Sequence, residues 1–439
     1  MADAYATLLR GDSEQIGKDG REMTLKGIAE EIAMSSIRSC LPEPLVEKAL
    51  KKRTFSGRVY LVSAGKAAYS MARAAQMVLG KSIEAGIVVT KYGHVPGSLP
   101  GIRCFEGGHP VPDIKGIQGT EAVLEMTAHL DAEDTVLFLL SGGGSALFEK
   151  PLIPLAELQD ITDQLLRSGA GIEEINTIRK RLSAVKGGRF AQWCQPARVV
   201  TLALSDVLGD RLDAIASGPT VQDRSTSLEA RKIVERYGLT LSPEARRWME
   251  CETPRHLNVG DTEIIGSVKL LCEAAQAECI RQGFQVERVT DSLEGEAREV
   301  GRKLGKQLAD ARGKRAWVLG GETTVHVTGN GLGGRNQELA LSAAREIAGV
   351  PGVCLLSVGS DGTDGPTDAA GGIVDGTTYA SLLDKGISWE RAMAEHDSYH
   401  ALEVAHALVR TGPTGTNVND LVLLLREETE RKCEARENA

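Results

Sequence analysis

Five apolar runs in this chain each end in a glycine-rich turn that carries charged residues. They span 58–68, 135–149, 198–210, 315–338 and 353–372. A short apolar run that ends in glycine and precedes a helical pattern is typical of a strand leaving a parallel sheet at its carboxyl edge. Ligands bind at that edge in open α/β sheets. The repeated pattern therefore predicts an α/β enzyme that acts on small phosphorylated or carboxylated molecules.

Strand and helix patterns alternate along the chain, with one polar interruption at 242–263 that contains two prolines. This alternation predicts a mainly parallel sheet with helices on both faces. A chain of 439 residues also exceeds a single ordinary core. We therefore expect a weakly ordered lead-in at 1–22, a larger Rossmann-like domain at 23–250, a smaller α/β domain at 251–425 and a charged tail at 426–439.

Composition argues against several classes of partner. A net charge of −9 and 4% aromatic residues give neither the basic footprint nor the stacking side chains of a nucleic-acid binder. No apolar run approaches the ~18 residues of a membrane span, the first residues do not resemble a signal peptide, and the eight cysteines form no CxxC pair. We expect a cytoplasmic protein with reduced thiols that binds no nucleic acid or membrane, as a monomer or a homodimer.

Lys66 follows the first apolar run, in the string SAGKAA, where a helix is expected to start. Positive charge at a helix N-terminus is unfavourable by a few tenths of a kcal/mol. That cost is easier to explain if Lys66 faces an anion, although a solvated lysine is the simpler alternative. Neither a Walker A pattern nor GxGxxG follows this strand.

The string SGGGSALFE places serines and glycines where a strand becomes a helix, and it supplies the predicted anion-binding residues Ser141, Gly142, Gly143, Gly144 and Ser145. Their N–H groups and hydroxyls are suitable donors to a phosphate or carboxylate. A tight turn for strand–helix packing is the structural alternative. A serine hydrolase with Ser145 as nucleophile is a weaker one, because it would also need a suitably placed histidine.

Asp206 is the first charged residue after the run 198–204, and Asp210 follows it. Aspartates at this edge serve as a general base for a hydroxyl or as a Mg²⁺ ligand, whereas helix capping and turn formation are the structural alternatives. The preceding basic segment 176–191 is expected to be mostly a solvated surface, with one or two of its cations within reach of an anion.

The last third of the chain adds an arginine and further carboxylates. Arg335 follows two glycines at an expected helix start and presents a planar fork suited to carboxylate or phosphate. Glu322 and Asn336 are further predicted substrate- or phosphate-binding residues. Carboxylates clustered among glycines fit a hard cation, although aspartate-supported turns explain them too. The predicted metal ligands are Asp361, Asp364 and Asp368.

A lysine, an arginine, loop aspartates and anion-binding turns together are what phosphoryl transfer requires, because that chemistry depends on positioning and charge neutralisation. The HRD and DFG signatures of protein kinases are absent. From the residues alone, a metal-assisted kinase or another transferase acting on a small anion is the best interpretation.

The ordered strings resemble one family from about residue 25 to 425: SAGKAA, GGHPVPD, LSGGGSALFE, NTIRKRLSAVKGGRFA, SDVLGDRLDAIASGPT, GGETTVHVTGNGLGGRNQE, SVGSDGTDGPTDAAGG and GPTGTNVNDL. They are similar to the two-domain glycerate 2-kinases, whose C-terminal part is called the MOFRL domain. The resemblance implies ATP-dependent, Mg²⁺-assisted phosphorylation of D-glycerate at its 2-hydroxyl, giving 2-phosphoglycerate and ADP. It also implies an active site in the cleft between the two domains.

The resemblance places the family's key lysine, aspartate and arginine on Lys66, Asp206 and Arg335, with Asp210 as the alternative aspartate. Three other functions stay open. A kinase for a related small hydroxy acid needs the same residues, and a non-enzymatic sensor has no supporting motif. A hydroxypyruvate reductase would require NAD(P)H, and the missing GxGxxG weighs against it.

Overall fold

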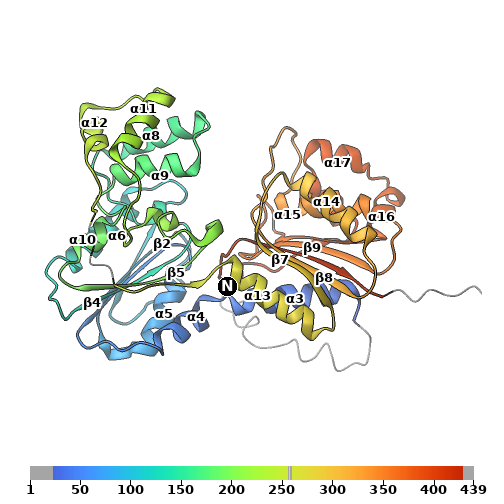
Figure 1. The fold of residues 1–439 in the computed structure, drawn as a ribbon, viewed down its shortest axis with the longest axis horizontal. Coiled ribbons are helices and arrows are strands. Elements are labelled where there is room, and N and C mark those ends of the chain that lie inside the picture. Colours follow the sequence, from blue (N-terminus) through green and yellow to red (C-terminus); the bar gives the residue numbers. More distant parts are fainter. Residues whose placement is uncertain (1–22, 256, 258–259, 429–439) are drawn as a thin grey trace, which may run out of the picture. The chain divides into compact units, whose positions relative to one another are not determined.

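The structure is a computed structural model that describes residues 23–255, 257 and 260–428. The chain forms two compact units. One, here called the parallel unit, is Leu41–Ser267. The other, here called the mixed unit, combines the N-terminal segment up to Cys40 with the residues from Val268 onward. Each is described by itself, and Figure 1 gives the element labels.

The parallel unit contains a six-stranded sheet in which every neighbouring pair is parallel. Its order is β3-β2-β1-β4-β5-β6. The strands are β1 (Val59–Ala64), β2 (Ile83–Lys91), β3 (Ile102–Gly107), β4 (Thr135–Leu140), β5 (Arg198–Leu204) and β6 (Thr262–Gly266). The chain moves outward from β1 to β3 and then returns to place β4 beside β1. The strand order therefore reverses between β1 and β4, which is where ligands bind in such sheets.

Alternate residues of β1 face opposite sides of this sheet, and both sides are covered. Val59 and Leu61 pack in the core under α4 and α5, while Val62 and Ala64 pack in the core that includes residues of α6 and α10. This two-sided burial explains the nearly continuous apolar strands. The covering helices are α4 (Pro42–Leu50), α5 (Ala68–Leu79), α6 (Ile114–Met126) and α10 (Arg189–Trp193), with η1 (Gly80–Ser82) after α5.

Four further helices of the parallel unit share a separate apolar core. They are α8 (Leu155–Arg167), α9 (Ile172–Arg181), α11 (Ser227–Tyr237) and α12 (Pro243–Glu250), drawn in green tones in Figure 1. The short elements α7 (Gly144–Leu147), η2 (Leu208–Asp210) and η3 (Ile215–Ser217) lie in the loops that follow β4 and β5. The helix α9 therefore belongs to a small helical layer in which α8 and α9 follow β4 along the chain and α11 and α12 follow β5.

The mixed unit contains a second six-stranded sheet, in the order β11-β10-β9-β12-β8-β7. Only β7 and β8 are parallel, and the other pairs are antiparallel. The strands are β7 (Gln285–Leu293), β8 (Arg315–Gly321), β9 (Val353–Gly359), β10 (Gly371–Asp375), β11 (Leu408–Val409) and β12 (Asp420–Arg426). Within the mixed unit, the last strand of the sequence thus occupies a central position.

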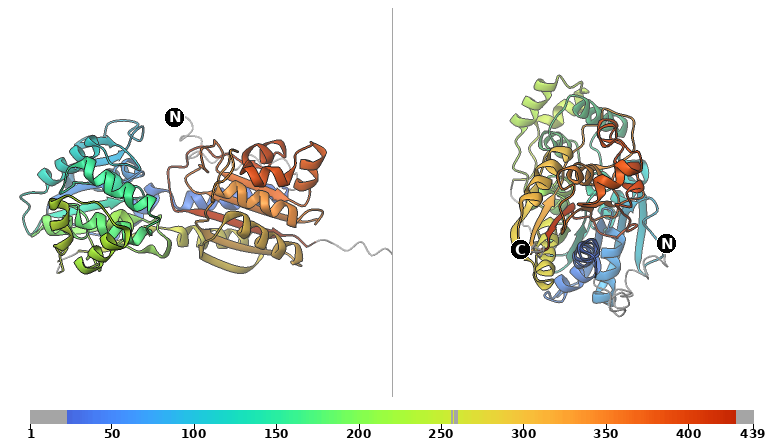
Figure 2. Two further views of the ribbon diagram at one scale, coloured as in Figure 1. Left: turned by 90° about the horizontal axis from the view of Figure 1, so that it is seen from above. Right: turned by 90° about the vertical axis from the view of Figure 1, so that its right-hand side faces the viewer.

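Helices cover both faces of the mixed sheet, as the views in Figures 1 and 2 show. One face carries α14 (Ala297–Asp310), α15 (Arg335–Glu346), α16 (Thr378–Asp384), α17 (Trp389–Glu395) and α18 (Ser398–Val404). The other carries α3 (Leu25–Ser39), which packs on β9 and β12, and α13 (Val268–Arg281). Within the described residues, no helix is both long and apolar enough to cross a membrane.

The α/β class and the two-part organisation are confirmed, but the grouping differs from the expected division in two places. The helix α3 packs with the mixed unit, and β6 belongs to the parallel unit. Periodicity identifies the apolar face of a helix but not the sheet that it covers. The segment 324–328, which follows β8, is a loop with one bridge at Thr324. The expected lead-in at 1–22 and most of the charged tail lie outside the described residues.

Candidate functional site

Lys66 and the loop Ser141–Ser145, here called the glycine loop, lie side by side in the parallel unit. They follow the neighbouring strands β1 and β4. The N–H of Lys66 donates to the carbonyl of Gly142 at 2.8 Å, and the N–H of Ala67 donates to Ser141 Oγ at 3.0 Å. The point where the strand order reverses therefore brings together two of the features singled out in the sequence.

Gly143 is the point at which this loop meets the side chains of Lys66 and His109. Its φ of +83° lies in the left-handed region that glycine adopts without steric cost. A Cβ there would lie 3.0 Å from His109 Cδ2 and 3.2 Å from Lys66 Cγ. Glycine thus allows the loop backbone to approach both side chains, and a larger residue would displace them.

His109 is a residue of this site that sequence reasoning missed. It follows β3 in the GGHPVPD string, so its place at the carboxyl edge was the available signal. Burial lowers the pKa of His109 to about 4, and the positive charges of Lys66, Lys91 and His94 add to the effect. His109 is therefore neutral at pH 7 and lies in a positive local potential that favours an anion.

The glycine loop has the donors of an anion cradle. Within the described part of the chain, the N–H groups of Gly142 and Gly143 donate to no acceptor. Ser145 Oγ lies 3.2 Å from Ser217 Oγ, which donates to Asn176 Oδ1 at 2.9 Å. Ser145 is thus bonded to a serine rather than to a histidine, which does not favour the hydrolase alternative.

Asp206 and Asp210 follow β5 at the same carboxyl edge, and both are partly buried. Asp210 has a φ of +53°, and its Oδ1 is buried without a hydrogen-bond partner in the described structure. Ala216 and Ser217, in the same connection, also have positive φ. Such conformations cost about 1–3 kcal/mol each and cluster at functional sites. Asp210 therefore offers an unsatisfied carboxylate oxygen to a cation or a hydroxyl.

The expectation of a solvated surface for segment 176–191 is wrong for most of its cations. Lys180, Arg181 and Lys186 are buried. Their long side chains reach acceptors in loops far along the chain, which amphipathic spacing alone does not reveal. Lys186 forms a fully buried ion pair with Glu149, with 2.5 Å between Nζ and Oε2.

Arg335 begins α15 in the mixed unit and is held by two carboxylates. Nε and Nη2 donate to Asp420 at 2.5 and 3.0 Å, and Nη1 lies 2.9 Å from Glu322 Oε1. Burial alone would lower the pKa of Arg335, but Asp420 and then Glu322 raise it overall. Burial raises the pKa of Asp420 to about 6, against the opposing effect of Arg335. Glu322 is among the residues predicted from the sequence, whereas Asp420 is not.

Asp364 and Asn336 support the start of α15. The carboxylate of Asp364 accepts hydrogen bonds from the N–H groups of Asn336 and Gln337 at 3.1 and 2.9 Å. The side chain of Asn336 accepts one from Ser357 Oγ at 2.6 Å. Both side chains are buried. These contacts fix the helix start from which Arg335 extends.

The three predicted metal ligands have separate partners. Asp361 accepts from the N–H and hydroxyl of Thr363, and Asp368 is paired with Tyr399 and Arg410, whereas Asp364 caps α15. The described residues contain no group of three or more His, Cys, Asp or Glu side chains placed to hold a metal ion. The structure does not bring these three carboxylates together.

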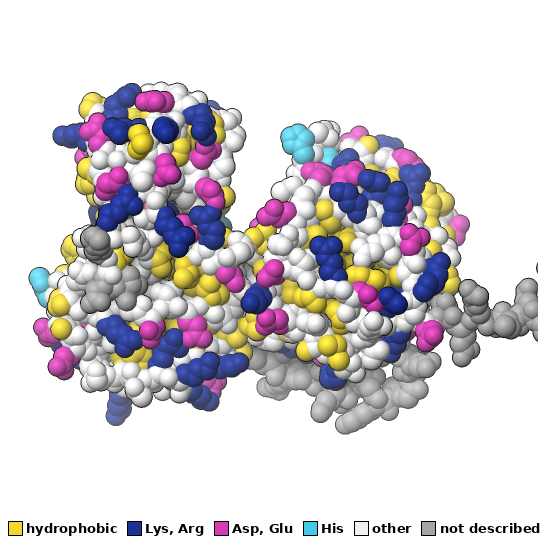
Figure 3. Space-filling model, viewed as in Figure 1, with side chains coloured by type: hydrophobic (Ala, Val, Ile, Leu, Met, Phe, Trp, Pro, Cys, Tyr) yellow, Lys and Arg dark blue, Asp and Glu magenta, His cyan; other side chains and the backbone are white. Residues whose placement is uncertain are grey.

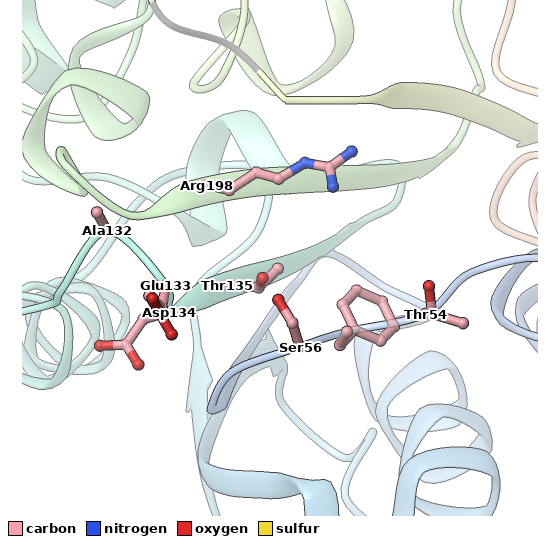
Figure 4. Close-up of a pocket in the computed structure, with 8 residues that line it drawn as sticks. Thr54, Ser56, Ala132, Glu133, Asp134, Thr135 and Arg198 are labelled. Atoms are coloured by element: carbon pink, nitrogen blue, oxygen red, sulfur yellow. The ribbon is translucent and has the colours of Figure 1, made fainter.

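A hollow of about 380 Å³ lies at the opposite edge of the parallel sheet, and Figure 4 shows its polar lining. It is formed at the amino ends of β1, β4 and β5 by residues 54–56, 132–135 and Arg198. None of the predicted site residues lines it. On the face drawn in Figure 3, basic and acidic side chains are interspersed.

The chain is similar to known proteins over most of its length. Residues 28–250 match a family described as a domain of unknown function (DUF4147), and residues 315–420 match the MOFRL family. The chain is 52% identical to a D-glycerate 2-kinase of Thermotoga maritima, over 91% of this chain and 98% of that protein. A crystal structure of glycerate kinase from Thermotoga maritima matches with a TM-score of 0.89, covering 92% of this chain and 99% of that chain. An Agrobacterium vitis protein that is 38% identical, over 93% of this chain and 97% of that protein, carries the name hydroxypyruvate reductase.

Proposed function

Because the chain belongs to the glycerate 2-kinase family, we propose that it transfers the γ-phosphoryl group of ATP to the 2-hydroxyl of D-glycerate. The O–P bond to the 2-oxygen forms, the bond to the ADP leaving group breaks, and the hydroxyl proton leaves. The products are 2-phosphoglycerate and ADP. The observation that supports this most directly is the contact of Lys66 with the glycine loop at the strand-order reversal.

Lys66 and the glycine loop would hold the phosphate groups of the nucleotide. The N–H groups of Gly142 and Gly143 provide neutral donors, and the Lys66 side chain, whose Cγ lies 3.2 Å from the position of a Cβ at Gly143, would add a positive charge. Fixed donors aimed at developing charge are the main source of catalysis in phosphoryl transfer. A neutral His109 adds a hydrogen-bonding group without adding positive charge.

Arg335 would bind an anionic group of the same reactants, either the glycerate carboxylate or the transferring phosphoryl group. Asp420 occupies two of its nitrogens and fixes the plane of the guanidinium. Glu322 occupies the third and is exposed to solvent, so a substrate anion can replace it at Nη1. Asn336 would support this position through its contact with Asp364 and Ser357.

Asp206 and Asp210 would orient or deprotonate the attacking hydroxyl, or hold Mg²⁺. The unsatisfied buried Oδ1 of Asp210 fits an oxygen ligand of a hard cation. Asp361, Asp364 and Asp368 fit that role less well, because their oxygens already accept hydrogen bonds from the protein. Mg²⁺ bound at Asp206 or Asp210 would neutralise phosphate charge.

A coupled assay tests the proposal. Formation of ADP that depends on D-glycerate, with 2-phosphoglycerate identified by NMR, is the expected result. Oxidation of NADH in the presence of hydroxypyruvate, without ADP formation, would instead support the reductase. Lys66→Met should reduce kcat/KM about 100-fold or more. The exposed Lys81→Met is the matched control and should leave kcat/KM unchanged.

A further inference from the structure

Arg179 differs from the other cations of the segment 179–189 because, among the described residues, it has neither a carboxylate in an ion pair nor a set of backbone acceptors. Lys180 pairs with Asp213 and Asp223, Arg181 with Glu252, and Lys186 with Glu149, while Arg189 donates to three backbone carbonyls. The partners of these four cations therefore come from the protein itself. Among the described residues, Arg179 has no comparable set of partners.

The guanidinium of Arg179 makes a single long hydrogen bond, from Nη2 to the carbonyl of Ser145 at 3.3 Å. Its Nε is buried and has no hydrogen-bond partner among the described residues, and none of their carboxylates forms an ion pair with it. Burial lowers the pKa of Arg179. A partly buried cation whose buried Nε has no partner and no counter-charge is unfavourable, so the arrangement calls for an anion.

Glu149 does not supply that anion. Its Oε2 already pairs with Lys186, whose Nζ is 2.5 Å away, and both side chains are fully buried. A water molecule between Arg179 Nε and the unpaired Oε1 of Glu149 would satisfy two polar atoms. It would not change the charge, because two cations and one carboxylate leave a net charge of +1. The imbalance remains for a ligand to neutralise.

The position of Arg179 identifies where such a ligand would bind. Its Nη2 contacts Ser145 at one end of the glycine loop, and the N–H of Lys66 contacts Gly142 near the other. One turn earlier on α9, Asn176 accepts from Ser217, which holds the hydroxyl of Ser145. The helix α9 therefore supports the loop and carries the unbalanced cation to it.

We propose that Arg179 is a phosphate-binding residue of the glycine loop, and that it contacts a phosphate group of the bound nucleotide. The nature of the ligand rests on the proposed kinase function. Nε and the nitrogens of its planar fork match phosphate oxygens, and binding supplies the counter-charge that the protein lacks. Segment 176–191 thereby acquires a direct role in the reaction.

Binding of ADP and of adenosine to the full chain, measured by calorimetry, tests this inference. Arg179→Gln should weaken ADP binding by about 10-fold or more and leave adenosine binding unchanged, because only ADP carries phosphate. Arg179→Lys keeps the charge without the planar fork, so its ADP affinity should lie between those of the wild type and Arg179→Gln. Equal ADP affinity in Arg179→Gln and the wild type, or equal losses for ADP and adenosine, would overturn the proposal.

Arg181→Gln is the matched control. Arg181 lies on the same helix and is fully buried, but its partners are Glu252 and the carbonyls of Cys251 and Ser225. Its loss should lower the melting temperature without changing ADP affinity. If the wild type phosphorylates glycerate but Arg179→Gln binds ADP as tightly as the wild type, only this inference is rejected. If the wild type does not phosphorylate glycerate but Arg179→Gln still binds ADP more weakly, only the proposed substrate is rejected.

Discussion

Arg335 and Asp420 form a two-point contact in which Nε and Nη2 of the arginine donate to the two carboxylate oxygens at 2.5 and 3.0 Å. Asp420 is the first residue of the central strand β12, and Arg335 is the first residue of α15. A strand and a helix therefore fix the direction of one guanidinium. Only Nη1 remains for an exposed partner, now Glu322.

Asp420→Asn should weaken turnover. The amide keeps the shape of the carboxyl group but removes its charge, so Arg335 loses the partner that fixes its direction. We expect kcat/KM to fall, whereas the free energy of unfolding at pH 7, measured by urea denaturation, should not fall, because burial already disfavours the charged form of Asp420. Asp261→Asn is the control, because its exposed pair with Arg198 should contribute about 0–1 kcal/mol. Equal effects of the two substitutions would argue against this role for Asp420.

The pH dependence of activity should also report Asp420. Its pKa, raised to about 6 by burial, means that the carboxylate becomes protonated as the pH falls through 6. We expect kcat/KM to decline over this range in the wild type, and this inflection to be missing from Asp420→Asn. An inflection that persists in the variant would assign it to another group.

The titration of Asp420 should change stability in the opposite direction to activity as the pH falls. The folded-state pKa of Asp420 lies above the model value of 3.8, so the folded chain binds the proton more tightly. Its contribution to stability is fully present below about pH 4 and is lost as the pH rises through 6. Urea denaturation of the wild type and Asp420→Asn across this range should show the difference.

His109 should respond to anions at the glycine loop. Its pKa of about 4 reflects burial first and then the charges of Lys66, Lys91 and His94. Bound inorganic phosphate offsets those charges, so the pKa of His109 should rise, as followed by NMR of the imidazole. Lys66→Met should also raise it, without phosphate. No response to either change would place His109 outside the anion site.

Gly143→Ala separates backbone strain from loss of function. The substitution adds a Cβ at a φ of +83°, 3.0 Å from His109 and 3.2 Å from Lys66. Gly169→Ala is the control, because its φ is +72° but the space around its Cβ is open. Each should cost about 1–2 kcal/mol of stability. Only Gly143→Ala should also lose ADP binding, and comparable losses in both would refute the proposed cradle.

The parts of the site that follow one strand were predictable from the sequence. Lys66 and the glycine loop both lie in segments where glycine closely follows an apolar run, and this pattern predicts the end of a strand. The parallel pairing of β1 with β4 then brings the two segments together. His109 and Asp420 were missed for a different reason. Each acts through a neighbour far away in sequence, which local spacing does not specify. The environment of Arg335 depends on antiparallel pairing of β12 with β8, which the expected parallel order did not include.

The aspartates of 361–368 show the same limit. Their spacing is compatible with a cation site and with turns. Asp364 instead caps a helix that begins 29 residues earlier in the chain, at Arg335. Composition indicates which ligands a segment could offer, whereas tertiary contacts decide which oxygens remain available.

The course of the chain through the two sheets has a consequence for biosynthesis. The helix α3 leaves the ribosome before the other described elements but packs on β9 and β12, and β12 is the last described strand. The whole parallel unit, Leu41–Ser267, is synthesised in between and can fold as soon as it emerges. The apolar face of nascent α3 therefore has no sheet to pack on until β9 and β12 have been translated.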